Sequence, residues 1–327
     1  MFNQTEAILS QYEMEIHEVT KGRGAYICDT NQGMKLLVEF RGSNEKGEFL
    51  KKLLEQLNLH GFQVEQIVEN KNGAAVSEDE GTGERFLLKD YVEGVELNVS
   101  NQNEVYGAAR ELARLHKEIM GLELMIPDKI KNISESVVDV RIRHYRELIK
   151  TRNYIRGKKK KNEFEQIYMR QYMPMLDAAE KSIQILQEQE DKGVEYICCH
   201  GDYNQHNVIW SNGCWRIIHF ENFVYSWQMV DLANFLRKML EKNDWDENFG
   251  IGLLRNYQKE LQLSQDKCWQ LYGLLLFPEK FWKITNHYMN SRKAWISERD
   301  IEKLKKVVVQ EEVRLKFMEN LFSILTE

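Results

Sequence analysis

The 327-residue sequence predicts an α+β fold, in which a small antiparallel sheet with one helix precedes a larger and mostly helical region. Two patterns lead to this fold class. Up to about residue 92, short apolar runs and period-2 alternation dominate, as in half-buried strands. After Gly94, apolar residues recur at helical spacing over long segments. The chain holds three prolines, which fits long helices because proline breaks a helix interior.

The first part of the chain predicts the element order β-β-β-α-β-β. Three segments with turn residues between them are typical of sequential antiparallel strands, namely YEMEIHEV (12–19), GAYICDT (24–30) and MKLLVEF (34–40). Segment 44–61 places leucines on one helical face and stops at a glycine, which predicts one helix. Segments 63–70 and 84–94 predict two further strands, joined by a polar turn. We therefore expect residues 1–92 to form a five-stranded antiparallel unit.

The rest of the chain, residues 93–327, predicts a helical unit with one internal hairpin. The pattern favours helices at 103–119, 132–156, 163–189, 229–242, 247–261, 265–290 and 298–325. The one strand-like interruption is NVIWSNGCWRIIHFEN (207–222). Its SNG is typical of a hairpin turn between two short apolar runs.

Composition excludes several classes of protein. A net charge of −6 argues against a general nucleic-acid binder. The five cysteines form no CxxC pair, so we expect neither a disulfide framework nor a zinc site. The N-terminal residues resemble no signal peptide, and no apolar run approaches the roughly 20 residues that span a bilayer. The sequence thus predicts a cytoplasmic protein whose partners include neither nucleic acid nor membrane.

The stretch HGDYNQHN carries the strongest chemical signal in the chain. It places His200, Asp202 and Asn207 in the spacing HxDxxxxN. In phosphoryl transfer, an aspartate orients or deprotonates the acceptor hydroxyl, and an asparagine five residues later binds a metal ion. A hairpin, the turn IIHFE and then DLA with Asp231 follow.

This succession resembles the pattern HGDxxxxNV, hairpin, hhDFE and DLA of the aminoglycoside-phosphotransferase-like and choline-kinase-like families. Segments 90–98 and 271–292 are similar to the CotS-type spore-coat branch of that superfamily. The resemblance implies a bilobal protein-kinase-like fold. It also implies that Asp202 is the catalytic base, that His200 and Asp231 complete the catalytic group, and that Asn207 is a metal ligand.

Two positions depart from the family pattern. His219 stands where the resemblance places a metal-binding aspartate, and imidazole is a poor ligand for magnesium. Glu221 follows two residues later and, on a strand, would share its face, so the expected metal group is Asn207, His219 and Glu221. Val38 stands where the resemblance places the phosphate-binding lysine. Lys35 lies three residues away, on the opposite face of the strand, where we expect it to be solvated.

Lys89 is a third unusual position. The resemblance places it at the back of the nucleotide pocket, and with Asp90, Tyr91 and Val38 it makes up the expected nucleotide-binding residues. A buried lysine needs a partner or loses its charge, and Glu48 is the candidate partner. The hypothesis is that Lys89 either replaces the missing strand lysine from another direction or fills the adenine pocket.

Two weaker signals stay open. The turn KGRGAY (21–26) could cover phosphates, although two glycines in a hairpin are also ordinary turn residues. The basic run 141–161 could dock an anionic partner, or it could be a solvated helix face.

The sequence leaves two functions open. One is a degenerate, pseudokinase-like phosphotransferase with a structural or interaction role in sporulation, assembled onto the spore coat with coat proteins as partners and with no cofactor expected. The other is an active enzyme that transfers phosphate from ATP, with Mg²⁺, to the alcohol group of a small-molecule acceptor.

Overall fold

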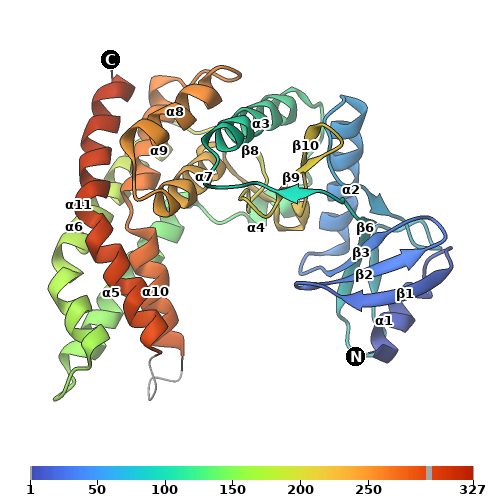
Figure 1. Cartoon of the computed structure of the whole chain (residues 1–327), viewed down its shortest axis with the longest axis horizontal. Coiled ribbons are helices and arrows are strands. Elements are labelled where there is room, and N and C mark those ends of the chain that lie inside the picture. Colours follow the sequence, from blue (N-terminus) through green and yellow to red (C-terminus); the bar gives the residue numbers. More distant parts are fainter. Residues whose placement is uncertain (1, 292–296, 327) are drawn as a thin grey trace. The chain divides into compact units, whose positions relative to one another are not determined.

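A computed structural model describes residues 2–291 and 297–326. The described chain divides into two compact units (Figure 1). The first unit contains residues up to 98, 114–133 and 200–224, and the second contains 99–113, 134–199 and the residues from 225 onward. The boundary expected after residue 92 stays a prediction.

The first unit is built on an antiparallel sheet, which has six strands within the described residues. Its order is β1-β2-β3-β6-β4, and β5 also pairs with β6. The strands are β1 (Ile16–Lys21), β2 (Ala25–Thr30), β3 (Lys35–Glu39), β4 (Ile67–Val68), β5 (Val76–Glu78) and β6 (Arg85–Asp90). The predicted number of five strands was therefore wrong by one. The extra strand, β5, lies inside the segment interpreted as a polar turn, because three residues are too few to show a period.

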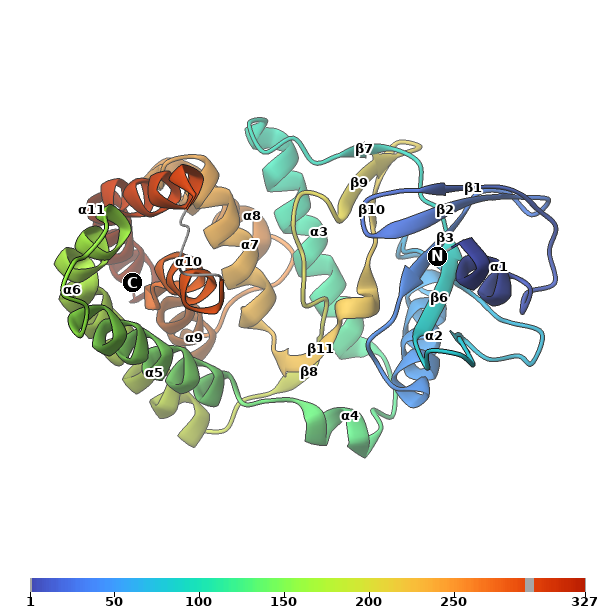
Figure 2. The ribbon, with the colours of Figure 1, turned by 90° about the horizontal axis from the view of Figure 1, so that it is seen from below.

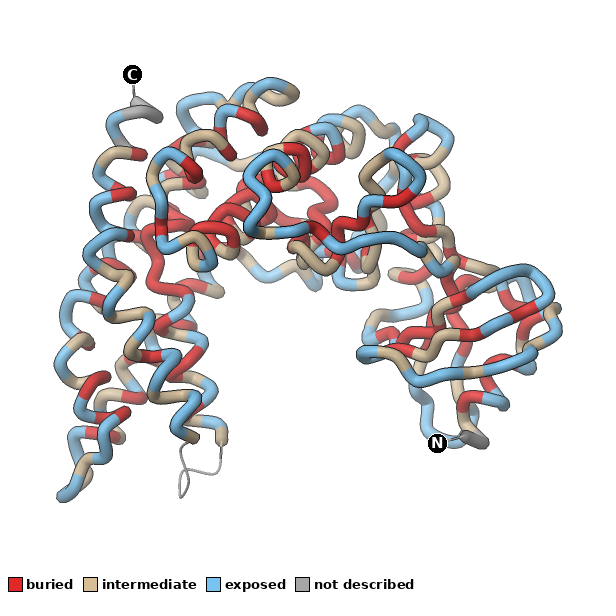
Figure 3. The backbone as a smooth tube through the Cα atoms, in the orientation of Figure 1, coloured by how far each residue is buried: buried red, intermediate tan, exposed pale blue. Residues whose placement is uncertain are grey.

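A helix that the sequence pattern did not predict covers part of this sheet. Helix α1 (Phe2–Leu9) places Ile8 and Leu9 in a buried cluster with residues of β2, β3 and β6. Tyr12, predicted to begin the first strand, lies after α1 in the same cluster, and the strand begins four residues later. Figure 3 shows buried residues on the strands of this sheet, and β6 holds four consecutive ones.

Helix α2 (Asn44–Leu59) confirms the predicted helix. The side chain of Ser43 accepts a hydrogen bond from the backbone N–H of Lys46 at 3.2 Å and caps its first turn. The predicted leucine face is buried. Gly47 lies where a Cβ atom would meet Val76 at 2.2 Å, so the glycine permits a close approach of α2 to β5.

The predicted hairpin is confirmed as β9 (Val208–Ser211) and β10 (Cys214–Ile217), whose strands pair antiparallel. A short strand not predicted, β7 (Val95–Glu96), pairs with β9. Val64 forms a parallel bridge with Ile217, which joins the hairpin to the segment before β4. A Cβ atom on Gly94 would stand 2.5 Å from the Trp210 carbonyl oxygen, so this crossing needs glycine.

The second unit is mainly helical, as predicted. Its helices are α5 (Val137–Arg156), α6 (Glu163–Asp191), α7 (Met229–Lys242), α8 (Glu247–Gln258), α9 (Gln265–Leu276), α10 (Glu279–Asn290) and α11 (Glu298–Thr326). Helix α3 (Gln102–Gly121) is divided between the two units, and α4 (Asp128–Ile133) belongs to the first. The strands β8 (Tyr196–Cys199) and β11 (Val224–Trp227) pair with each other. The hairpin is therefore not the one strand-like interruption after residue 93, because β7, β8 and β11 are strands too.

One predicted helix, 265–290, is in fact two. Pro278 separates α9 from α10, because proline lacks the N–H that a helix interior needs and disfavours the helical region for the residue before it. Phe277 accordingly has an extended conformation, with φ −60° and ψ 131°. No helix among those described has the length and apolar character that a membrane span requires.

The core of the second unit forms where α5, α6, α10 and α11 meet, and Figure 2 shows α5 and α6 side by side. Aromatic side chains fill much of it. Tyr168 stacks on Phe281, with ring centroids 5.3 Å apart, and the Tyr168 hydroxyl donates to the Leu148 carbonyl at 2.6 Å. Asn162 and Glu165 form a capping box at the start of α6.

The basic run 141–161 has two different environments. Arg141, its first residue, is buried and pairs with the buried Glu279, and Lys158 pairs with Glu165. Arg146 and Lys150, by contrast, lie on the surface of α5. The run is therefore partly a structural element of the core, which the sequence did not predict.

The Arg141–Glu279 pair predicts an acid-dependent loss of stability. Burial alone would raise the pKa of Glu279, but Arg141, Lys283 and Arg237 outweigh it and lower the pKa to about 2 from an ordinary 4.5. A depressed folded-state pKa gives stability that is present above the ordinary value and lost as the pH falls towards 2. We expect this group to contribute about 3 kcal/mol of the stability lost between pH 5 and pH 2.

Urea unfolding, followed by circular dichroism across this pH range, measures that loss. The control is the double variant Arg141→Met/Glu279→Gln, whose stability should fall less steeply with acid. If the free energy of unfolding of the double variant falls with acid as steeply as that of the wild type, the Arg141–Glu279 pair does not cause the loss of stability.

Candidate active-site cleft

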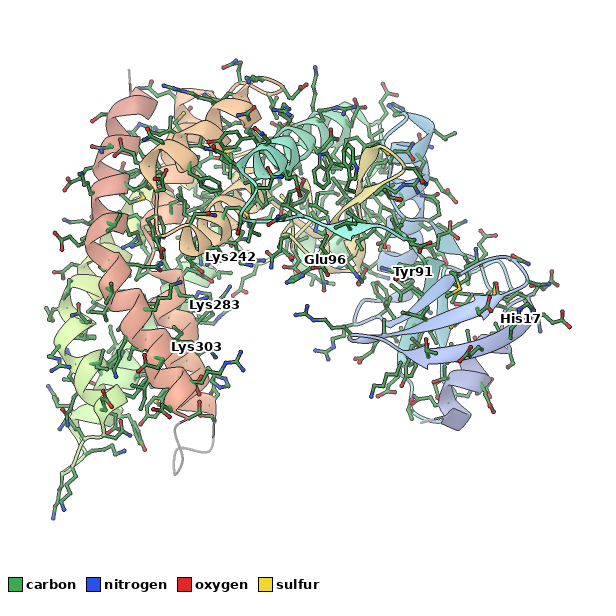
Figure 4. All side chains as sticks on the ribbon, viewed as in Figure 1. His17, Tyr91, Glu96, Lys242, Lys283 and Lys303 are labelled. Carbon is green, nitrogen blue, oxygen red and sulfur yellow. The ribbon has the colours of Figure 1, made fainter. Side chains whose placement is uncertain are left out.

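A cleft of about 800 Å³ lies within the first unit. It is lined by the turn between β1 and β2, by β3, by the start of α2, by the segment after β6 and by the loops around the hairpin. Seven predicted site residues line it, namely Val38, Asp90, Tyr91, Asp202, Asn207, His219 and Glu221. Figure 4 labels Tyr91 together with Glu96, another lining residue of the same segment. The structure thus brings together most of the residues that the motif spacing singled out.

The loop between β8 and β9 positions Asp202. The Asn207 amide nitrogen donates to the Asp202 backbone carbonyl at 2.8 Å and to its carboxylate oxygen Oδ2 at 3.2 Å. The Asn204 amide nitrogen donates to the same Asp202 carbonyl at 2.8 Å. These side chains, of which Asn204 was not predicted, hold the loop in one conformation with the Asp202 carboxylate at the cleft.

His200 is fully buried beneath this loop. The backbone N–H of Asp202 donates to His200 Nδ1 at 3.2 Å, so this nitrogen carries no proton. The other ring nitrogen, Nε2, therefore donates to the Ile218 carbonyl at 2.9 Å. His200 connects the loop to the end of the hairpin, and both of its nitrogens are used in doing so.

Gly201 lies where two backbone segments nearly touch. Its φ is +80°, in the left-handed region that favours glycine. A Cβ atom at this position would stand 2.2 Å from the Asn222 carbonyl oxygen. The close approach of the Asp202 loop to residues 220–222 therefore depends on glycine.

The segment expected to continue as a strand after the hairpin turns instead. Residues Phe220–Asn222 form a 3₁₀ turn, and His219 before it has φ +68° and ψ 44°. A left-handed conformation at a residue other than glycine is uncommon and costs free energy. His219 and Glu221 still meet, because His219 Nδ1 donates to Glu221 Oε1 at 2.8 Å.

Lys89 lies at the centre of a buried charge network. Its side chain is fully buried, and its ammonium nitrogen is 2.9 Å from Glu65 Oε2 and 2.6 Å from Glu221 Oε2. Glu65 also accepts the backbone N–H of Phe220 at 2.9 Å. We call Lys89, Glu65, Glu221 and His219 the Lys89 network. Both carboxylates line the cleft, whereas Lys89 lies behind them.

Electrostatics favour charged forms of Lys89 and Glu221. Burial alone would lower the pKa of Lys89, but the carboxylates of Glu65 and Glu221 outweigh it and raise that pKa. Burial alone would raise the pKa of Glu221, yet Lys89 and His219 hold it well below its ordinary value. The network is thus an ion pair shared by one ammonium group and two carboxylates.

Two predictions about lysine partners were wrong. The expected partner of Lys89 was Glu48, but the Glu48 carboxylate accepts the backbone N–H of Ala75 at 2.7 Å. Lys35 is not solvated, since it is buried and its ammonium lies 2.7 Å from Asp90 Oδ1 on the neighbouring strand. Lys35 and Asp90 are cross-strand partners in the β3–β6 register, a relation that residue spacing within one strand does not reveal.

The side chains around the Lys89 network do not fit a magnesium ion. Magnesium needs several hard oxygen ligands in octahedral geometry. Both Glu221 oxygens are already occupied, by Lys89 and by His219, and Asp202 Oδ2 accepts from Asn207. Within residues 2–291 and 297–326, no group of three or more His, Cys, Asp or Glu side chains is arranged to hold a metal ion.

Asp231, the third predicted catalytic residue, belongs to the second unit. It is buried in the first turn of α7. Burial raises the pKa of the Cys199 thiol, and the negative charge of Asp231 raises it further. Cys199 itself is fully buried on β8.

The structure adds two functional candidates that the motif spacing did not single out, Glu65 and Lys46. Glu65 lies in a segment predicted as a strand, and the need of a buried lysine for a carboxylate could have pointed to it. Lys46 lies at the start of α2 and lines the cleft. Its place in an otherwise ordinary amphipathic helix gave no signal.

Comparison with known proteins places the chain among kinase-like proteins. It is 22% identical to spore coat protein S of Bacillus subtilis (strain 168) over 96% of this chain and 92% of that protein. An aminoglycoside phosphotransferase structure from Alicyclobacillus acidocaldarius superposes with a TM-score of 0.83 at 17% identity, covering 98% of this chain and 96% of that one.

A microcompartment-associated aminopropanol kinase superposes with a TM-score of 0.69 at 11% identity, covering 98% of each chain. These likenesses confirm the predicted α+β, protein-kinase-like fold and the resemblance to CotS-type proteins. The family model described as "Spore coat putative kinase YutH" matches residues 5–321. The chain therefore belongs to this spore-coat kinase-like family.

Proposed function

We propose that this protein is a spore-coat component of kinase-like fold that interacts with other coat proteins and does not transfer phosphate from ATP. The observation that carries the proposal is how the Glu221 carboxylate is bound. Both of its carboxylate oxygens are bound within the protein, one by Lys89 and one by His219. The Glu221 carboxylate, which a metal ion would need as a ligand, is therefore already neutralised by side chains of the protein.

Two other features support a non-catalytic role. Val38, at the position of the expected phosphate-binding lysine, is buried and apolar. Lys89 does not replace that lysine, because its charge is already shared between two carboxylates. The name of the B. subtilis relative supports association with the spore coat.

A second candidate function is an active phosphotransferase. It is favoured by Asp202, which lines the cleft and is oriented by Asn207 as a base acting on a hydroxyl group would be. On this alternative, an acceptor alcohol lies against Asp202, and ATP with Mg²⁺ supplies the phosphoryl group.

An assay of ADP release from Mg-ATP separates the two functions. The wild-type protein is tested against a panel of small alcohols and amino alcohols, with Asp202→Asn as the control. We expect the two proteins to give the same low rate with every compound. Acceptor-dependent ADP release that Asp202→Asn abolishes would overturn the non-catalytic proposal.

Complementation tests the coat role directly. In a sporulating host that lacks its own copy, the Asp202→Asn protein should restore the coat protein composition as fully as the wild type does. Restoration by the wild type alone would show that Asp202 chemistry is needed.

Back-substitution tests the structural reason. His219→Asp with Val38→Lys leaves Glu221 bound to Lys89, so we expect this double variant to gain no Mg-dependent ATP binding. Adding Lys89→Leu frees the Glu221 carboxylate, and the triple variant should bind ATP more tightly with Mg²⁺ than without it. Gain of Mg-dependent binding in the double variant would show that Lys89 does not block the site.

A further inference from the structure

The basic run 141–161 ends in a loop whose positive charges have no role in the cleft. Residues 150–161 hold seven Lys or Arg and no Asp or Glu, in a chain whose net charge is −6. The loop connects α5 to α6 within the second unit (Figure 1). We call its residues Arg156, Lys159, Lys160 and Lys161 the basic tip.

The four side chains of the basic tip have no carboxylate partner within the part of the chain that the structure describes. The two carboxylates that follow them in the sequence are bound elsewhere, Glu165 by Lys158 and Glu163 by Lys305 of α11. Lys305 is shared, because it also pairs with Glu302 on its own helix.

The local charge stays positive when each of these carboxylates is counted. Residues 152–165 hold six Lys or Arg and two Glu. The α11 residues Lys305 and Glu302 add one of each. Seven positive groups thus face three negative ones, so the tip keeps an excess of positive charge.

Hydrogen bonds hold the loop in one conformation. The backbone N–H of Lys158 donates to the Ile155 carbonyl at 3.1 Å, and the Lys161 ammonium donates to the Lys158 carbonyl at 3.0 Å. The Gln166 side-chain amide donates to the Lys161 carbonyl at 3.1 Å. Ile155 and Phe164, on either side of the loop, are fully buried. A preorganised surface of this kind loses less entropy on binding than a flexible one.

The class of partner follows from what surrounds these charges. No large apolar side chain is exposed among residues 150–163, all of which the structure describes, whereas a segment that inserts into lipid presents such side chains. The net charge of −6 opposes the long-range attraction on which nucleic-acid binding depends. Three of the four tip residues are lysines, whose mobile point charges suit carboxylates at variable positions along a polypeptide.

We propose that the basic tip docks an acidic segment of a partner polypeptide. The proposal rests on the proposed function in one respect, namely that this partner is another coat protein. Exposed ion pairs are individually weak and are screened by salt, so several of them act together here. Charge complementarity of this kind speeds encounter and selects the partner, and it requires no phosphate transfer.

Fluorescence anisotropy of a labelled oligoglutamate peptide, at an ionic strength of about 0.1 M, tests this surface. We expect saturable binding by the wild type and at least about tenfold weaker binding by Lys159→Glu/Lys160→Glu, which corresponds to about 1.4 kcal/mol. Lys159→Ala/Lys160→Ala should lose less, in the same direction. Raising the ionic strength to about 1 M shortens the screening length from about 10 Å to about 3 Å and should weaken wild-type binding.

Lys181→Glu/Lys316→Glu is the matched control. Both lysines are exposed on helices of the same unit, α6 and α11, and lie outside the tip. This variant changes the net charge by the same amount, and it should bind oligoglutamate within about twofold of the wild type, because distant charges are screened. Equal losses in the two glutamate variants would show non-specific charge attraction and overturn the proposal.

The sporulating host that lacks its own copy tests whether the partner belongs to the coat. Lys159→Glu/Lys160→Glu should restore the coat protein composition less fully than Lys181→Glu/Lys316→Glu does. Equal restoration by the two variants would overturn the assignment of the partner to the coat.

Two further binding results would overturn the proposal. One is the absence of saturable oligoglutamate binding. The other is binding of duplex DNA, or of phosphatidylcholine vesicles that contain phosphatidylserine, which depends on the tip and is as tight as oligoglutamate binding. These results leave the non-catalytic function standing. Conversely, acceptor-dependent ADP release with Mg²⁺ would overturn the non-catalytic function and leave tip-dependent oligoglutamate binding unchanged.

Discussion

Replacing Lys89 by methionine should lower the free energy of unfolding by about 3–5 kcal/mol, the usual cost of removing one partner of a buried ion pair. Lys89 is fully buried, and its ammonium group is the cation shared by Glu65 and Glu221. Methionine keeps most of the volume of the side chain but leaves two carboxylates facing each other in a desolvated place. Urea unfolding followed by circular dichroism measures the difference.

Lys35→Met is the matched control. Lys35 also lies in the sheet and pairs with a carboxylate, but its partner Asp90 has a side chain 46% exposed to solvent. An ion pair with an exposed member contributes about 1 kcal/mol or less. A loss in Lys89→Met no larger than that in Lys35→Met would contradict the importance of the Lys89 network.

The pH dependence gives an independent check on Lys89→Met. In the wild type, the pKa of Glu221 is well below its ordinary value of 4.5, so its contribution is present above pH 4.5 and lost as the pH falls below it. In the variant, the carboxylates of Glu65 and Glu221 can take up protons as the pH falls, and they then no longer repel each other. The difference between the two proteins should therefore shrink as the pH falls below about 4.5.

Gly201→Ala should destabilise the first unit by about 2–5 kcal/mol, the sum of a left-handed backbone and an overpacked contact. The new Cβ atom would stand 2.2 Å from the Asn222 carbonyl oxygen, so one of the two backbone segments must move. Because Asp202 follows Gly201 directly, the same movement would displace the loop that lines the cleft.

Gly213→Ala is the control for the backbone contribution. Gly213 has φ +81°, close to that of Gly201, but a Cβ atom there would meet no other atom within 4 Å. We expect it to cost about 1–2 kcal/mol from the backbone alone. If urea unfolding shows that Gly201→Ala and Gly213→Ala lose the same free energy of unfolding, the contact between residue 201 and the Asn222 carbonyl does not add to the cost.

The long elements of the fold could be predicted from the sequence because their patterns are long. The predicted helix 229–242 has the bounds of α7, since its apolar face repeats over several turns. Strand β5 and helix α1 could not be predicted in this way, because each is short and depends on packing against the sheet. Pro278 divides α9 from α10, although the apolar spacing on its two sides favours one continuous helix.

Site residues could be predicted where a sequence motif fixes their spacing. The ion pairs that these residues form with distant parts of the chain could not be predicted. Asp202, Asn207, His219 and Glu221 line one cleft, as the motif implied. That Lys89 would meet Glu221 could not be predicted, because 132 residues separate them and only the tertiary structure brings them together. The cross-strand partner of Lys35 is likewise set by sheet register.

Glu221 is central to the proposed function, because its neutralisation by Lys89 and His219 is what makes it unavailable to a metal ion. Calorimetric titration of ATP into the wild-type protein, once with Mg²⁺ and once with EDTA at the same ionic strength, tests this most directly. We predict that ATP binds no more tightly with Mg²⁺ than in EDTA. Binding that is about tenfold or more tighter with Mg²⁺, which corresponds to about 1.4 kcal/mol, would contradict it.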